Sequence, residues 1–134
     1  MIPLDARSLA PAYHPIADLA RHRSVSFHLA IHGRTPGLHL HLPDRSTISI
    51  TDDGIGGAAA RKPSGSTGWT VTRTLATGQH ATVYDSTIFG PHHHLGTDID
   101  PVLGVLHRYL PPAPSPRPAS ARRSSLLSRL LRLT

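Results

Sequence analysis

The sequence predicts a small α+β fold: an antiparallel β-meander of about five strands packed against one or two helices. Three observations support this class. Apolar residues recur at every second position in several short runs, two Pro-initiated segments with helical spacing flank these runs, and most connections are short and rich in turn residues. An antiparallel sheet of this kind buries one face and leaves the other in water.

Five segments predict strands because apolar residues alternate with polar or small ones. They span residues 24–32, 38–42, 47–51, 69–75 and 81–87. If the first hairpin pairs Ile31 with Leu38, His28 lies opposite His41 and His39 opposite Ala30. Arg73 falls on the apolar side of its strand, which indicates a strand end, an edge position or an error in the predicted register.

Two segments predict helices, at residues 15–23 and 101–110. Pro15 and Pro101 suit the first helical position, where a missing N–H costs little. Asp100 stands where an N-cap residue is expected before the second helix. A proline pair then ends that helix, since proline cannot continue it.

Positive charge is concentrated at the end of the chain. Residues 1–110 carry eight Arg, one Lys and eight Asp, for a formal net charge of +1, whereas residues 111–134 carry five Arg and no acidic residue. We therefore expect one domain over residues 1–110, a Pro/Arg-rich linker over 111–123 and a short amphipathic Leu/Arg helix over 124–134. The basic pI describes the tail rather than the domain.

Missing residue types narrow the chemistry. The chain has no Cys, Glu or Asn. The absence of Cys excludes disulfides, thiolate nucleophiles, Cys-ligated zinc and iron–sulfur clusters. No apolar run approaches the ~20 residues of a membrane span, and no signal-peptide pattern is visible, so we expect a cytoplasmic protein. High Ala, Pro, Gly and Arg content is typical of a GC-rich actinobacterial genome or of its phages.

Histidines on the first predicted hairpin are one candidate site. His28, His32, His39 and His41 share the face opposite the apolar residues, and cross-strand neighbours have Cβ atoms about 5 Å apart. Imidazoles this close could bind zinc. The alternative is a solvated face in which His replaces Ser or Thr and no cofactor binds. Facing imidazoles would also repel when protonated, so we expect lower stability or altered association below about pH 6.

A second histidine group follows the last predicted strand. His92, His93 and His94 precede Asp98 and Asp100, and zinc, nickel and copper accept imidazole and carboxylate ligands. Adjacent residues on one loop cannot easily all face one ion, and Asp100 is the expected N-cap. The alternative interpretation is a polar loop without metal.

Enzyme templates fit this sequence poorly. The glycine-rich run at residues 54–57 lacks the Lys and Ser/Thr of a phosphate-binding loop, no G-x-S-x-G elbow occurs, and H-E-x-x-H is impossible without Glu. Base stacking on the sheet is also disfavoured, because the polar face carries few aromatic residues. The sequence therefore favours a non-enzymatic protein.

The tail is the main candidate for binding a partner. Its Leu and Arg residues form an amphipathic pattern that suits a protein groove, nucleic acid or an anionic membrane, or that folds back on the domain. The predicted contact residues are Arg122, Arg123, Leu126, Leu127, Arg129, Leu130, Leu131 and Arg132. We expect an accessory or adaptor protein that binds a macromolecular partner. The alternatives are a nucleic-acid accessory factor acting through the tail and a metal-binding protein or metal-dependent enzyme that uses the His-rich hairpin, with zinc as the expected metal.

Overall fold

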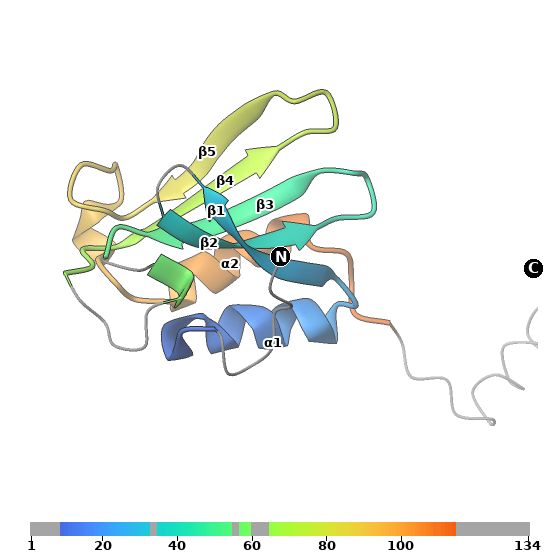
Figure 1. Cartoon of the computed structure of the whole chain (residues 1–134), viewed down its shortest axis with the longest axis horizontal. Helices are drawn as coiled ribbons and strands as arrows, with labels where there is room; N and C mark the ends of the chain where they lie inside the picture. The colour runs from blue at the N-terminus through green and yellow to red at the C-terminus, as the bar shows by residue number, and fades with distance from the viewer. Residues whose placement is uncertain (1–8, 33–34, 55–56, 60–64, 115–134) are drawn as a thin grey trace, which may run out of the picture.

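The computed structural model of the chain describes residues 9–32, 35–54, 57–59 and 65–114 (Figure 1). The predicted strands and helices of the domain all fall within these ranges, apart from short connections. Most of the predicted linker and the whole predicted tail helix, residues 115–134, lie outside them. The domain boundaries proposed for the tail therefore stay predictions.

Five antiparallel strands form one sheet whose spatial order, β1-β2-β3-β4-β5, follows the chain. Their bounds are β1 Ser26–His32, β2 Thr35–His41, β3 Thr47–Asp52, β4 Trp69–Thr74 and β5 His80–Asp85. Each successive strand pairs with the one before it, as expected for a meander. The predicted α+β class is confirmed.

Two helices, α1 (His14–His22) and α2 (Asp100–Tyr109), cover one face of the sheet (Figure 1). Both carry proline in the first turn, as predicted. Three short 3₁₀ turns accompany them: η1 (Pro11–Tyr13), η2 (Gly57–Ala59) and η3 (His93–Leu95). Both helices end on the same side of the domain, because Arg23 after α1 donates from Nη1 to the Pro111 carbonyl after α2, at 3.0 Å.

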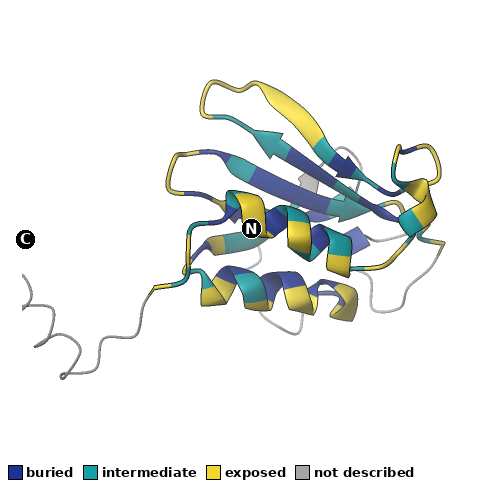
Figure 2. Ribbon diagram, turned by 180° about the vertical axis from the view of Figure 1, so that it is seen from behind, coloured by how far each residue is buried: buried dark blue, intermediate teal, exposed yellow. Residues whose placement is uncertain are grey.

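The core lies between the sheet and the two helices (Figure 2). Its largest fully buried aliphatic side chains are Ile16, Leu38, Leu40, Ile48, Ile50, Val71, Val102 and Leu106. At one end Tyr13 packs edge-to-face on Trp69, with ring centroids 4.8 Å apart. The Tyr13 hydroxyl donates to Asp52 at 2.6 Å, and burial raises the Tyr13 pKa, so the phenol stays neutral and fixes η1 against the end of β3.

The opposite face of the sheet is polar. Across β3 and β4, hydroxyl side chains pair in register, with Thr47 opposite Thr74, Ser49 opposite Thr72, and Thr51 opposite Thr70. Cross-strand Thr and Ser pairs support a sheet through β-branched packing and hydrogen bonding. The alternation seen in the sequence therefore separates an apolar face from a hydroxyl-rich one.

The predicted register of the first hairpin is wrong by two residues. Ile31 pairs with Pro36 instead of Leu38, which places His28 opposite His39 and Ser26 opposite His41. Shifting a strand by two residues leaves the same side chains on each face. Apolar alternation therefore could not distinguish the two registers.

The structure also tests the predicted cap of the second helix and the predicted position of Arg73. Asp100 is the first residue of α2 and Ile99 holds the N-cap position, so the predicted Asp100 cap is wrong. Asp98 takes part of that role, since its Oδ1 accepts from the Asp100 N–H at 3.0 Å. Arg73 is the penultimate residue of β4 and pairs with Ile48, which confirms the strand-end interpretation.

Two glycines give opposite predictions for replacement by alanine. A Cβ on Gly68 would lie 2.0 Å from the Ser86 carbonyl oxygen, whereas Gly104 in α2 has no neighbouring atom within 4 Å. Gly68→Ala should lower the free energy of unfolding by about 1–3 kcal/mol through overpacking. Gly104→Ala should raise it by about 0.5–1 kcal/mol through helix propensity. Denaturant unfolding measures both; a harmless Gly68→Ala would contradict this packing.

Candidate functional site

Two histidines of the first hairpin form a stacked pair on the polar face. Nδ1 of His28 lies 2.6 Å from Nε2 of His41, with ring centroids 4.6 Å apart and planes 7° apart. His39 lies 5.4 Å from His28 by ring centroid, and its Nδ1 is 3.4 Å from Ser49 Oγ. A contact of this length between two ring nitrogens requires one imidazole to donate and the other to accept. The pair therefore favours the state in which the two rings are not both protonated.

The predicted hairpin metal site is not assembled as a ligand group. In the described ranges, no three His or Asp side chains are grouped so that they could hold a metal ion. His28, His39 and His41 do share one face, as predicted, while the side chain of His32 lies outside the described structure. Zinc binding on this hairpin stays a prediction.

The second histidine group is dispersed rather than convergent. His92 stacks on Tyr84, with ring centroids 5.1 Å apart. The rings of His93 and His94 are 6.1 Å apart and nearly perpendicular. Because Asp98 binds the backbone at the start of α2, its carboxylate is committed to the helix end. The geometry suits a polar loop better than a metal centre.

The connection between β5 and α2 begins with a tightly braced loop, residues 85–92. The Asp85 carboxylate accepts from the Thr87 N–H at 2.9 Å, and the His92 N–H donates to the Asp85 carbonyl at 2.9 Å. Ser86 is fully buried; its hydroxyl accepts from the Trp69 N–H and donates to the Gly96 carbonyl. These bonds fix both ends of the loop.

A second set of bonds braces the outer part of the same loop. The Ile88 N–H donates to Thr67 Oγ1 at 2.9 Å, and Thr67 itself donates to the carboxylate of Asp53 through its N–H and its hydroxyl. Partial burial opposes ionisation of Asp53, but the bonds from Thr67 and Gly68 outweigh it and lower the Asp53 pKa. The loop is therefore held by an ionised carboxylate.

This rigid loop presents two apolar side chains to solvent. Ile88 is 61% exposed and Phe89 is 96% exposed. Burying a Phe or Ile side chain stabilises a folded protein by about 1.5–3 kcal/mol. The domain lacks this stabilisation because the braced loop holds both side chains in solvent. We name Ile88 and Phe89 the apolar knob.

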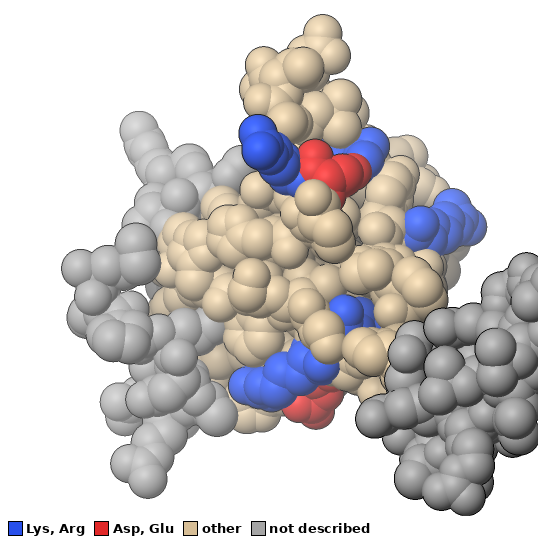
Figure 3. Space-filling model, turned by 90° about the vertical axis from the view of Figure 1, so that its right-hand side faces the viewer, with Lys and Arg blue, Asp and Glu red and all other residues tan. Residues whose placement is uncertain are grey.

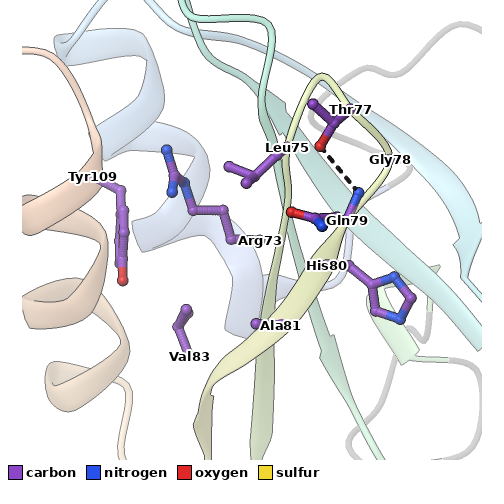
Figure 4. Close-up of a pocket in the computed structure, with 9 residues that line it drawn as sticks. All are labelled: Arg73, Leu75, Thr77, Gly78, Gln79, His80, Ala81, Val83 and Tyr109. Atoms are coloured by element: carbon purple, nitrogen blue, oxygen red, sulfur yellow. Dashed lines mark hydrogen bonds between the residues drawn. The ribbon is translucent and has the colours of Figure 1, made fainter.

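An open groove of about 830 Å³ lies at the other end of β5, beside the β4–β5 turn (Figure 4). Leu75, Ala81 and Val83 supply its apolar lining, and Tyr109 from the last turn of α2 faces them. Tyr109 lies in the last turn of α2, so this helix ends at the groove, and residues 76–80 of the β4–β5 turn are exposed. We name this open groove the β5 groove.

Arg73 forms the charged wall of the β5 groove. Its guanidinium carbon lies 5.2 Å from the centroid of the Tyr109 ring, and Nη2 donates to Asp44 Oδ2 at 3.1 Å. Hydrogen bonds from Ser46, together with the charge of Arg73, lower the Asp44 pKa. A cation held over an aromatic ring in this way can also contact an aromatic side chain that enters the groove.

In the part of the chain that the structure describes, Arg and most Asp residues lie at opposite ends. All five described Arg lie at the end that holds the groove and the C-termini of both helices: Arg21 in the last turn of α1, Arg23 directly after α1, Arg45 between β2 and β3, Arg73 near the end of β4 and Arg108 in the last turn of α2. Figure 3 looks onto this end and shows Arg side chains with acidic side chains among them. Asp18 and Asp44 pair with two of these Arg. The end holding the apolar knob carries the other five described Asp: Asp52, Asp53, Asp85, Asp98 and Asp100. Arg7, Arg34, Arg61 and Lys62 lie outside the described ranges.

The predicted partner-binding residues of the tail all lie beyond the described residues. They are Arg122, Arg123, Leu126, Leu127, Arg129, Leu130, Leu131 and Arg132. The last described residues, 111–114, follow α2 at the basic end of the domain, next to Arg23. The tail therefore continues from the end that carries the β5 groove.

Sequence reasoning missed both the apolar knob and the β5 groove. One signal for the knob was present: Ile88 and Phe89 are adjacent apolar residues inside a turn, where alternation has already stopped. The signal for the groove was Arg73, whose place on the apolar side of its strand marks the point where the helical layer ends. Val83 and Tyr109 gave no separate signal, because each fits its local pattern.

Comparison with protein-family models, curated proteins and solved structures gives no match for this chain. Within the described part of the chain, no helix has the length and apolar character needed to cross a membrane. Functional inference therefore depends on the geometry and charge of the chain itself.

The His28–His41 pair predicts a loss of stability in acid. Burial and the nearby His28 lower the pKa of His41, so the unfolded chain binds a proton more readily than the folded one. The contribution of the neutral His41 to the stability of the folded state is complete above the ordinary histidine pKa of about 6.5. It declines as the pH falls below that value. Two protonated imidazoles held this close repel each other, which destabilises the hairpin in acid.

Thermal unfolding of the wild type and of His41→Thr between about pH 7.5 and 5.5 tests this effect. The other histidines are present in both proteins, so the difference between the two curves isolates the pair. We expect the wild type to lose more stability in acid than the variant. Parallel curves would show that the pair has no energetic role.

Proposed function

We propose that this chain is a cytoplasmic, non-enzymatic adaptor that binds a protein partner, with the β5 groove as the main contact of its folded domain. The observation that carries this proposal is an apolar groove beside an edge strand. β5 is one of the two edge strands of the sheet, and Ala81 and Val83, which line the groove, belong to it. An edge strand next to an apolar groove suits an added peptide strand, because the backbone supplies hydrogen bonds and the groove accepts side chains.

The size and lining of the groove suit the binding of a side chain better than catalysis. Its volume of about 830 Å³ lies within the range of ligand pockets, but its lining offers no nucleophile paired with a base. Arg73 is already paired with Asp44, and His80 at the hairpin turn points away from Tyr109 (Figure 4). We therefore expect the groove to bind an aromatic or aliphatic side chain rather than to catalyse a reaction.

The tail adds a second contact to this proposal. It begins beside the groove, at the end where Arg23 and Pro111 meet, and its five Arg and several Leu residues could extend the contact along a bound protein. A partner that carries acidic residues beside an apolar anchor would match both features. Charged groups around such a contact act mainly on specificity and association rate.

A nucleic-acid partner is a second candidate, favoured by one observation. The five described Arg gather at the end from which the Arg-rich tail continues (Figure 3). The near-zero formal charge of residues 1–110 does not reveal this clustering. Cations concentrated on one surface contact phosphates regardless of sequence.

The protein-binding proposal is tested by selecting random peptides displayed on phage against the full-length protein. Selected peptides should share an apolar or aromatic anchor, and Val83→Arg should weaken their binding by at least about tenfold. The matched control is Thr82→Arg, on the polar face of the same strand, which should bind as the wild type does. Failure to select peptides, or equal loss in both variants, would count against the groove.

The nucleic-acid candidate makes a separate prediction. Replacing Arg122, Arg123, Arg129 and Arg132 by Gln should remove most binding to a fluorescent DNA duplex, because up to four phosphate contacts are lost. Wild-type binding should fall steeply between about 50 and about 200 mM salt. Fluorescence anisotropy measures both effects. Weak wild-type binding that salt does not change would eliminate this candidate.

A further inference from the structure

The apolar knob and the β5 groove are complementary surfaces on one chain. The knob offers a phenyl ring that is 96% exposed, and the groove offers an apolar lining with Arg73 over Tyr109. An aromatic ring entering the groove would cover Val83 and Ala81 and come within reach of the guanidinium of Arg73. Because the knob is braced before binding, little conformational freedom would be lost on docking.

The knob cannot reach the groove of its own molecule. It follows the last residue of β5, Asp85, whereas the groove lies at the first residues of that strand. A six-residue strand spans about 17 Å, and the loop of residues 85–92 is closed by the bond from His92 N–H to the Asp85 carbonyl. A knob that enters this groove must therefore come from another molecule.

Charge favours the same pairing of ends. The knob lies at the end with Asp52, Asp53, Asp85, Asp98 and Asp100, and the groove lies at the end with the five described Arg. Bringing the knob end of one molecule to the groove end of the next places the described Asp residues near the described Arg residues, an arrangement that steers association and fixes its orientation. A symmetric contact between two knobs would instead bring two acidic ends together.

We propose that the chain associates head to tail, with Ile88 and Phe89 of one molecule docked in the β5 groove of the next. This inference rests on the proposed function, since it names a second copy of the chain as the partner of the same groove. A contact between unlike surfaces builds open chains, in which one knob and one groove stay free at the ends, or closed rings, in which none does. The knob covers only part of the roughly 800 Å² per partner of a standard interface, so the association is weak and salt-sensitive.

Analytical ultracentrifugation of the full-length protein, over about a hundredfold range of concentration, tests this proposal. The wild type should form concentration-dependent oligomers that salt weakens. Phe89→Asp replaces the phenyl ring of the knob by a charge and Val83→Arg blocks the groove, so each variant alone should be monomeric. Thr82→Arg, on the opposite face of β5, should associate as the wild type does.

Mixing the two defective variants gives the sharpest result. Phe89→Asp keeps a groove and Val83→Arg keeps a knob, so an equimolar mixture should form a one-to-one heterodimer and nothing larger. If Val83→Arg lowers the melting temperature, Ala81→Arg replaces it, because Ala81 is exposed and lines the same groove. A mixture that stays monomeric would overturn the proposal.

Other outcomes separate this inference from the proposed function. A wild type that is monomeric at every concentration, but whose selected peptides still require Val83, would overturn self-association and leave protein binding standing. Oligomers that persist in Phe89→Asp would overturn the knob-in-groove contact and point to another interface, such as pairing of β5 edges. A monomeric wild type with no groove-dependent peptide would overturn both.

Discussion

The structure depends on one constraint: a five-stranded sheet with a single apolar face must be covered from the same chain. The strands alternate strictly enough that Leu38, Ile48 and Val71 all lie on one side, and α1 and α2 supply the cover. With an odd number of antiparallel strands, β1 and β5 run in the same direction. A helix that turns back before β1 and another that turns back after β5 must then also run in the same direction.

The shared direction of the two helices affects how charge is distributed between the two ends of the domain. Parallel helices place both negative dipole ends on one side, where Arg21 and Arg108 occupy the last turns and stabilise them. The positive end of α2 lies at the opposite side, where Asp98 and Asp100 begin the helix. Helix electrostatics on this topology therefore accounts for the charges at the helix ends. Arg45, Arg73, Asp52, Asp53 and Asp85 lie on the strands and their connections.

The candidate surfaces arise where cover by the helices ends. α2 stops at Tyr109 before a proline pair, while the β4–β5 hairpin continues to its turn at residues 75–79. This difference in length leaves Val83 and Leu75 half-buried and opens the groove. At the other end of β5 the braced loop directs Phe89 into solvent. Both surfaces follow from the ends of elements rather than from any sequence motif.

The sequence predicted the elements well because their signals are local. Period-two alternation located the five strands, and Pro15 and Pro101 located the helix starts. The register of the first hairpin was predicted wrongly because a shift of two residues conserves the faces. The Asp100 cap was predicted wrongly because the helix begins one residue earlier, so the Leu103 N–H already donates to the Ile99 carbonyl. The groove, the knob and the distribution of charge depend on the relative lengths and directions of elements that lie far apart in the sequence. The pattern of a single segment therefore does not predict them.

Methyl-resolved NMR of the full-length protein during dilution tests docking of the knob in the groove, because it observes both surfaces of the contact at once. If the knob docks in the groove, the methyl signals of Ile88 and Val83 shift together with one concentration dependence, while those of the Thr70 and Thr72 methyl groups on the polar face stay unchanged. Shifts confined to one of the two surfaces, or centred on the polar face, would contradict it.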